Sequence, residues 1–212
     1  MVRQERALRT RQALITSAAT VFHRDGFNVA SLSEISARAG VSNGALHFHF
    51  ANKAALAEAV ENAAAQRLDE LTAVAQLSAD NALQLLVNAS HGLARRLAED
   101  VVLRAGFQLG ADLVRDGCRD LRRQWQEWVE RTLKEAAGEG LLNGVSAETV
   151  ATAVVAATTG FEVLGARDPD WLAPRTLTRF WQLLLPRLAA ASVRGQLRAA
   201  GAAAKDRGST AP

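Results

Sequence analysis

Residues 31–53 read SLSEISARAGVSNGALHFHFANK, and they carry the strongest structural signal in the chain. Ser31 and Glu34, three positions apart, form a capping-box pattern, so a helix is predicted to begin there. Gly40 favours a turn that leaves this helix, and Ser42 is a suitable N-cap for a second, shorter one. Two helices around a tight glycine turn are typical of a helix-turn-helix, whose second helix enters the major groove of DNA. An ordinary pair of core helices would show the same pattern.

The flanking residues make the pattern more specific. Residues 10–27, TRQALITSAATVFHRDGF, place apolar side chains at helical spacing and end on a glycine and an aromatic ring. On these residues the first 60 or so positions resemble the tetracycline-repressor (TetR) family of regulators. Within it, GALHFHF at 44–50 and VLRAGFQLG at 102–110 are most similar to the γ-butyrolactone autoregulator receptors. The resemblance rests on Thr10, Arg11, Ile15, Ala18, Phe22, Gly26, Phe27, Ser31, Leu32, Ile35, Ala39, Gly40, Val41, Ser42, Gly44, Leu46, His49, Phe50 and Lys53.

Composition and charge agree with a globular, DNA-binding protein. The chain has 212 residues, of which 49% are hydrophobic and 22% charged, as in globular rather than disordered proteins. Residues 1–53 carry seven Lys or Arg against three acids, whereas the remainder is nearly balanced. Excess positive charge at the predicted DNA-binding end suits phosphate neutralisation, although a solvated basic face would look similar. The single cysteine, Cys118, excludes an intrachain disulfide framework and suits a reducing cytoplasm.

The remaining sequence predicts helices throughout, and the expected fold class is all-α. Helices are expected over 52–75, 80–98, 100–113, 119–137, 146–165 and 177–193, with no strand-like alternation and no repeat. The predicted domains are a three-helix helix-turn-helix DNA-binding domain at 1–52 and a ligand-binding and dimerisation domain at 53–198. A flexible tail is expected at 199–212. No secretory signal is expected, since the N-terminal residues lack an apolar segment. No run of 18 apolar residues occurs, so a membrane partner is not expected and the predicted location is cytoplasmic, at the nucleoid.

The resemblance assigns DNA contacts along the helix-turn-helix. Gly44 lets the backbone approach the groove closely. Asn43 stands where the related receptors usually have Lys, and an amide pairs with adenine rather than guanine, so the operator is expected to differ from theirs. His47 stands where the family has Tyr, which adds a pH-dependent charge. Lys53, at a helix N-terminus, is expected to contact a phosphate. The predicted DNA contacts are Arg9, Arg11, Ser31, Ser33, Ser42, Asn43, Gly44, His47, His49 and Lys53.

Two C-terminal segments predict a homodimer interface. Residues 147–165 are almost uniformly small or β-branched, and the helix at 177–193 is apolar nearly all round. A single domain could bury both helices internally. The resemblance implies instead a four-helix interface between two copies, and two-fold symmetry would suit two DNA half-sites. The predicted interface residues are Ala153, Ala157, Phe180, Trp181, Leu184 and Leu188.

The resemblance also implies an apolar site for a small lipophilic effector. The receptor subfamily places an indole where Trp125 lies, and Trp128 follows one turn later on the same side. One of the two could be core and the other pocket, and plain packing is the ordinary role of a Trp in a helical domain. Thr158 or Gln108 could supply a polar group in a mostly apolar cavity. The predicted pocket residues are Trp125, Trp128, Phe107, Leu103, Gln108, Leu86, Val87, Val154, Thr158 and Phe161.

Catalytic chemistry is not predicted. His47 and His49 are two positions apart and cannot form a helix-borne zinc pair; Cys118 has no placed His partner. We therefore expect no enzyme, metal or cofactor. The predicted function is a transcriptional repressor that binds pseudo-palindromic operator DNA, is released by a γ-butyrolactone-type signal and controls secondary metabolism or its own genes. The alternatives are a pseudo-receptor that answers antibiotics or no ligand, and a sensor or carrier of the same fold that no longer binds DNA, which the substitutions at Asn43 and His47 keep open.

Overall fold

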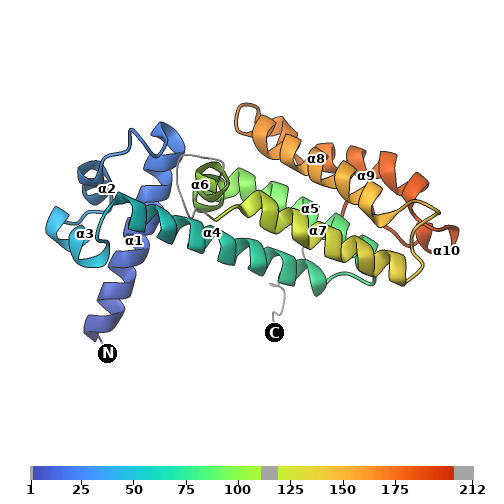
Figure 1. Cartoon of the computed structure of the whole chain (residues 1–212), viewed down its shortest axis with the longest axis horizontal. Coiled ribbons are helices and arrows are strands. Elements are labelled where there is room, and N and C mark those ends of the chain that lie inside the picture. Colours follow the sequence, from blue (N-terminus) through green and yellow to red (C-terminus); the bar gives the residue numbers. More distant parts are fainter. Residues whose placement is uncertain (1, 111–118, 203–212) are drawn as a thin grey trace, which may run out of the picture. The chain divides into compact units, whose positions relative to one another are not determined.

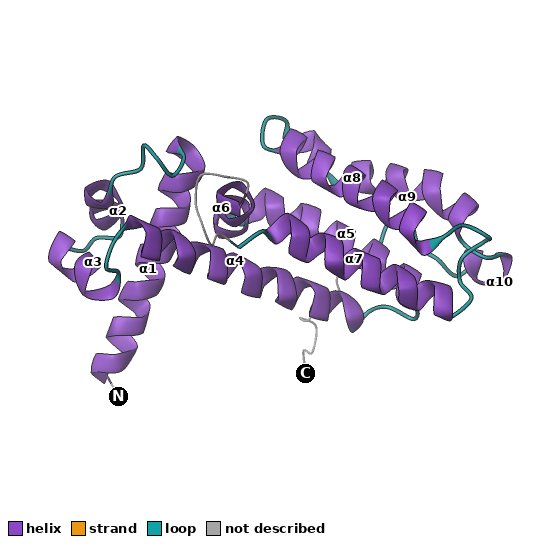
Figure 2. Ribbon diagram, in the orientation of Figure 1, coloured by secondary structure: helices purple, strands orange, loops and turns teal. Residues whose placement is uncertain are grey.

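The structure, a computed structural model, describes residues 2–110 and 119–202 (Figure 1). These ranges are helical apart from loops and one isolated antiparallel bridge, Leu142 to Ala189 (Figure 2). The all-α prediction is confirmed. Cys118 lies outside the described residues. The elements are α1 (Val2–Asp25), α2 (Leu32–Arg38), α3 (Asn43–His49), α4 (Lys53–Gln76), α5 (Ala82–Glu99), α6 (Val101–Gly110), α7 (Leu121–Gly138), α8 (Ala147–Gly165), the 3-10 helix η1 (Pro169–Leu172), α9 (Pro174–Leu188) and α10 (Ala191–Arg194).

The chain divides into two compact units. Unit 1 comprises Met1–Glu70 and Glu99–Trp125, and unit 2 comprises Leu71–Ala98 and Gln126–Pro212. The partition is not sequential, because the first part of α4 and all of α6 belong with α1, α2 and α3. The predicted boundary after residue 52 therefore separates segments that share one compact unit.

Unit 1 is built on the apolar face of α1. Leu14, Ala18 and Phe22 recur at helical spacing and are at most 1% exposed, so this face is the core side of the helix. α1 packs against α2 and α6. It ends at Asp25, and Gly26 follows with a φ of 79°, a left-handed conformation that glycine adopts without a steric penalty.

Helix starts follow the predicted caps with one exception. The Ser42 and Ser146 hydroxyls accept from the amides of Ala45 and Thr149 at 3.2 and 3.1 Å, as N-caps do. α2 begins at Leu32 as expected, but the capping box is wrong. The Ser31 hydroxyl lies 2.6 Å from that of Ser33 and caps no amide.

Unit 2 contains α5, the last residues of α4, most of α7, and α8 to α10. The predicted helix over 177–193 is wrong in its bounds: α9 begins at Pro174, where a missing amide proton costs nothing, and ends two residues after Pro186. After α9 the backbone forms a short contact with the α7–α8 loop, in which the amide of Ala190 donates to the carbonyl of Leu141 at 2.7 Å. Of the described helices, α8 alone has the length and apolar composition of a membrane span, and only 28% of that window is buried.

Residues 198–202 are held against α5, which corrects the prediction of flexibility at positions 199–202. Gln84 accepts from the amide of Arg198 at 2.8 Å, and Asn88 accepts from that of Ala202 at 2.9 Å. The His91 Nε2 lies 3.0 Å from the carbonyl oxygen of Ala199. Burial lowers the pKa of His91, and the bond to this carbonyl opposes the shift.

Candidate nucleic-acid interface and effector site

The helix-turn-helix is held by a small apolar core and a tight turn. Ile35 of α2 and Leu46 of α3 are both fully buried. Gly40 has a φ of 69°, which a side chain would strain, and the Val41 amide returns to the carbonyl of Ser36 at 3.0 Å. Ser36 is 4% exposed, as the close approach of two steeply crossing helices requires. This geometry leaves the opposite face of α3 accessible.

That accessible face carries several of the predicted DNA contacts. Gly44 and His47 are exposed, and only the Ser42 hydroxyl lies within 4 Å of the position that a Cβ at residue 44 would take. The Oδ1 of Asn43 lies 2.5 Å from the Ser36 hydroxyl of α2. An adenine contact that uses both groups of the amide would therefore compete with this bond. His49 is half-buried, between the rings of the flanking phenylalanines.

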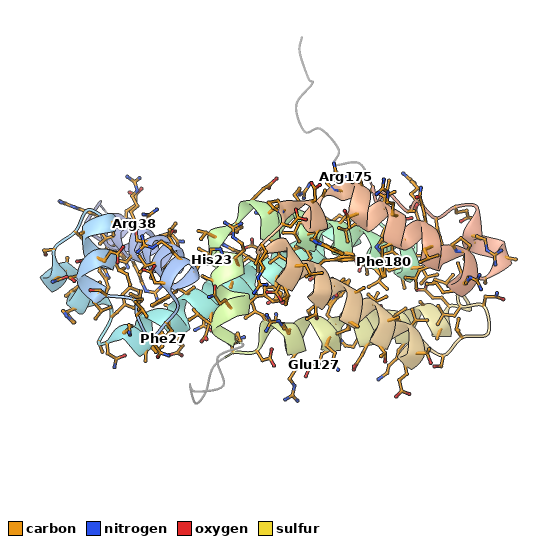
Figure 3. All side chains as sticks on the ribbon, turned by 90° about the horizontal axis from the view of Figure 1, so that it is seen from above. His23, Phe27, Arg38, Glu127, Arg175 and Phe180 are labelled. Atoms are coloured by element: carbon orange, nitrogen blue, oxygen red, sulfur yellow. The ribbon has the colours of Figure 1, made fainter. Side chains whose placement is uncertain are left out.

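Ion pairs occupy all three acids of residues 1–53. Arg24 binds Asp25 and Glu34, each at 2.5 Å, and Glu5 pairs with Arg9 at 2.5 Å. Hydrogen bonding to Asp25 and Glu34 raises the pKa of Arg24, and the same contact lowers the pKa of Asp25. Arg24 thus serves to join α1 and α2. Arg38, which the sequence reasoning did not select, is exposed at the end of α2 (Figure 3).

Two of the predicted DNA contacts, Lys53 and Arg11, have partners within unit 1. The Lys53 Nζ donates to the carbonyls of Asn28 and Ala30 at 3.0 and 3.1 Å, and lies 4.8 Å from the centroid of the Phe27 ring (Figure 3). The Arg11 guanidinium carbon lies 5.1 Å from the centroid of the Phe50 ring. Both cations stabilise the packing of unit 1. Through its hydrogen bonds, Lys53 connects the α1–α2 loop to the start of α4.

The predicted effector residues fall into both units. In unit 1, Leu103, Phe107 and Trp125 are at most 3% exposed. Gln108 is exposed instead, and its Oε1 lies 3.0 Å from the Nδ1 of His23 on α1 (Figure 3). Gln108 therefore links α6 to α1 in the structure, a role that no local sequence pattern indicates.

In unit 2 the remaining candidates mostly form core. Leu86, Val87 and Val154 are fully buried, and Trp128 is half-buried. The Thr158 hydroxyl donates to the carbonyl of Val154 at 2.8 Å. Thr158 and Phe161 line a cavity of about 10 Å³, room for one water molecule. A groove of about 610 Å³ lies between α7 and α8, and none of the predicted pocket residues line it; its lining is Gln126, Glu130, Lys134, Ala147, Glu148, Ala151, Thr152, Val155 and Ala156.

The outer faces of α8 and α9 are apolar and incompletely covered. Phe161 of α8 and Phe180 of α9 meet edge to face, with ring centroids 5.5 Å apart (Figure 3). Of the predicted interface residues, Ala153 is exposed, Ala157, Phe180 and Leu184 are half-buried, and Trp181 and Leu188 are at most 3% exposed, within the core of the chain itself. Further exposed apolar residues, not among the predicted interface residues, are Val163 at 50%, Leu164 at 41%, Trp171 at 39% and Leu183 at 73%.

Comparison with known proteins agrees with this arrangement. Residues 14–60 match the model of the bacterial regulatory proteins of the tetR family, and residues 80–190 match the tetracyclin repressor-like C-terminal domain. The chain is 30% identical to the A-factor receptor protein of Streptomyces griseus over 208 residues, 95% of this chain and 71% of that protein.

Solved structures show the same fold. A γ-butyrolactone receptor (ArpA-like protein) superposes with a TM-score of 0.76 at 28% identity, covering 92% of this chain and 96% of that one. The TetR family protein CprB of Streptomyces coelicolor, in complex with its biological operator sequence, gives a TM-score of 0.73 at 32% identity, covering 90% and 94%. The family models, the curated relative and the fold agree with the helix-turn-helix geometry, and the chain belongs to the TetR family of bacterial regulatory proteins.

Proposed function

We propose that this DNA-binding regulator is a repressor that binds pseudo-palindromic operator DNA as a homodimer and is released by a small lipophilic signal of the γ-butyrolactone type. The observation that carries the proposal is the accessible face of α3 within the basic segment 1–53. The chain is also similar over 95% of its length to the A-factor receptor protein and over 92% to a γ-butyrolactone receptor structure. The target genes are those of secondary metabolism or its own. It acts in the cytoplasm, at the nucleoid, and has no enzymatic activity.

The homodimer is supported by the uncovered apolar surface of α8 and α9. Only 28% of the apolar window of α8 is buried within one copy, and contiguous exposed apolar surface commonly marks an interaction site. Val163 within α8, Trp171 in η1 and Leu183 in α9 are larger exposed apolar groups. A second copy would cover this surface and present two α3 helices to two half-sites.

Effector release is a population shift between two states of the dimer. A ligand that prefers the state with low DNA affinity weakens operator binding by the ratio of its two affinities, and DNA weakens ligand binding by the same factor. Trp125 is the candidate sensor, because it stands where the resemblance places the indole. At 2% exposure it also contributes to packing, so the test has to separate the two roles.

Fluorescence anisotropy with duplexes from the DNA upstream of the chain's own gene tests the proposal. The full chain is expected to bind one duplex specifically, and a synthetic acyl γ-butyrolactone is expected to release it. Specific binding without release indicates a pseudo-receptor. If the chain binds none of the duplexes specifically, it is a sensor or carrier that no longer binds operator DNA.

Variants at Trp125 separate sensing from packing. Trp125→Phe keeps much of the buried volume, whereas Trp125→Ala leaves a cavity that costs about 3–5 kcal/mol. If Trp125 senses the effector, Trp125→Phe binds DNA normally and resists release. Normal release by this variant places the sensor elsewhere, with Trp128 the next candidate.

A further inference from the structure

The accessible face of α3 carries a large aromatic ring that the DNA contacts predicted so far do not use. Phe48 is 82% exposed, although His49 after it is half-buried and Phe50 is buried. Leu46 is fully buried, so positions 44 and 48 lie on the opposite side of the helix, one turn apart. Phe48 and Gly44 therefore share the face of α3 that points away from the buried side occupied by Leu46.

The surroundings of this ring favour a specific contact. Gly44 leaves open space beside it, with only the Ser42 hydroxyl, at 3.8 Å, near the position of a Cβ. The His49 ring meets Phe48 edge on, with centroids 5.2 Å apart, which orients the phenyl group from one side. Because Gly44 has no side chain, a partner can come close to the backbone of α3 at this position. The exposed Phe48 ring, one turn later, can then cover an apolar group of that partner.

The major groove of DNA offers one such group. Among the four bases only thymine presents a methyl group, at C5, in the major groove; the other edges offer mainly hydrogen-bonding groups. A phenyl ring cannot hydrogen-bond to the polar edges, but it gains from covering a methyl group. The same ring held against the other three bases would bury polar atoms without partners, which is unfavourable.

We propose that Phe48 is a specificity-determining residue that packs on the C5-methyl group of a thymine in each operator half-site. This inference rests on the proposed function, because it requires α3 to enter the major groove. It adds an apolar contact to the polar ones expected from Asn43 and His47, and it predicts a thymine at a fixed position of each half-site.

The test removes the methyl group without changing any hydrogen bond. An operator is first enriched from random-sequence duplexes with the full chain, and its thymines are then replaced by deoxyuridine one position at a time. Loss of one buried methyl group is expected to weaken binding about fourfold, and loss in both half-sites about fifteenfold. Phe48→Ala should bind the thymine and deoxyuridine operators equally, and Phe48→Leu should keep part of the difference.

A matched control is available. Leu77, at 83% exposure, is as accessible as Phe48 but lies in unit 2 after the end of α4. Leu77→Ala should keep the full preference for thymine, so a general loss of apolar surface is separated from loss of the contact. Far-ultraviolet circular dichroism establishes that each variant retains its helices.

The outcomes distinguish the inference from the proposed function. If no sequence is enriched, the proposed function fails and the inference fails with it. If an operator is enriched but every deoxyuridine substitution is neutral, the inference alone is overturned. A fifteenfold preference that persists in Phe48→Ala also overturns it, because another residue then covers the methyl group.

Discussion

Replacement of Lys53 by Ala tests whether this residue acts mainly inside the protein. Its ammonium donates to the carbonyls of Asn28 and Ala30 at 3.0 and 3.1 Å and lies 4.8 Å from the Phe27 centroid. Hydrogen bonds from a charged donor contribute about 1.5–3 kcal/mol each, and an exposed cation–π contact about 0.5–1 kcal/mol. Because the side chain is half exposed and water competes for its protons, we expect a loss of about 2 kcal/mol from the α1–α2 loop.

Native-state hydrogen exchange measures this loss locally, without requiring the two units to unfold together. The amide of Ala30 donates to the carbonyl of Gly26 at 3.2 Å, so its exchange reports opening of the loop. Lys53→Ala should accelerate this exchange about thirtyfold, which corresponds to about 2 kcal/mol. Lys134→Ala, which removes an exposed lysine of unit 2, is the control and should leave the exchange of Ala30 unchanged.

Salt titration of operator binding separates the two roles of Lys53. A residue that neutralises a phosphate contributes about one unit to the slope of log K against log salt. We expect Lys53→Ala to weaken binding with little change of slope, since the ammonium is held by two carbonyls. Unchanged exchange at Ala30, together with a slope reduced by about one unit, would refute this reasoning and leave Lys53 as a phosphate contact alone.

Three further changes test other parts of the structure. Gly106→Ala should destabilise the protein by about 1–3 kcal/mol in chemical denaturation, because the added methyl overlaps Ala64; Gly138→Ala, with open space around it, should be neutral or slightly stabilising. The lowered pKa of His91 means that the folded state binds fewer protons, so stability is complete above the ordinary value of 6.5 and falls as the pH drops below it; His91→Gln should flatten denaturation midpoints between pH 7.5 and 5.5. Leu183→Asp should yield monomers in sedimentation, because it places a charge on the proposed dimer surface, and a stable dimer would exclude this surface.

The sequence by itself determined the helix-turn-helix, because its signals are local. Gly40 provides the left-handed turn, Ser42 caps α3, and Ile35 and Leu46 recur at the spacing of a buried face. Each of these features depends on residues within a few positions, so backbone geometry and burial follow from the pattern. The family and the all-α class followed from the same stretch and from helical periodicity in the rest of the chain.

Only the tertiary structure decided which distant groups become partners. Glu34 was expected to cap α2 with Ser31, but a stronger charged partner, Arg24, lies beside it in the fold. Gln108 faces His23 of α1, 85 positions away, rather than a cavity. Trp181 is fully buried in its own chain although it was expected at an interface between chains.

The same holds for the tail and for Phe48. The residues from Arg198 onward have no local signal for order. Even so, the backbone amides of Arg198 and Ala202 donate to the side-chain oxygens of Gln84 and Asn88 on α5, each 114 positions earlier in the chain. Phe48 looks like a core residue by composition, and its exposure becomes evident only once Leu46 is seen to take the buried side of so short a helix. A local pattern specifies the backbone and the buried face, whereas hydrogen-bond partners and exposure depend on which segments the whole fold brings together.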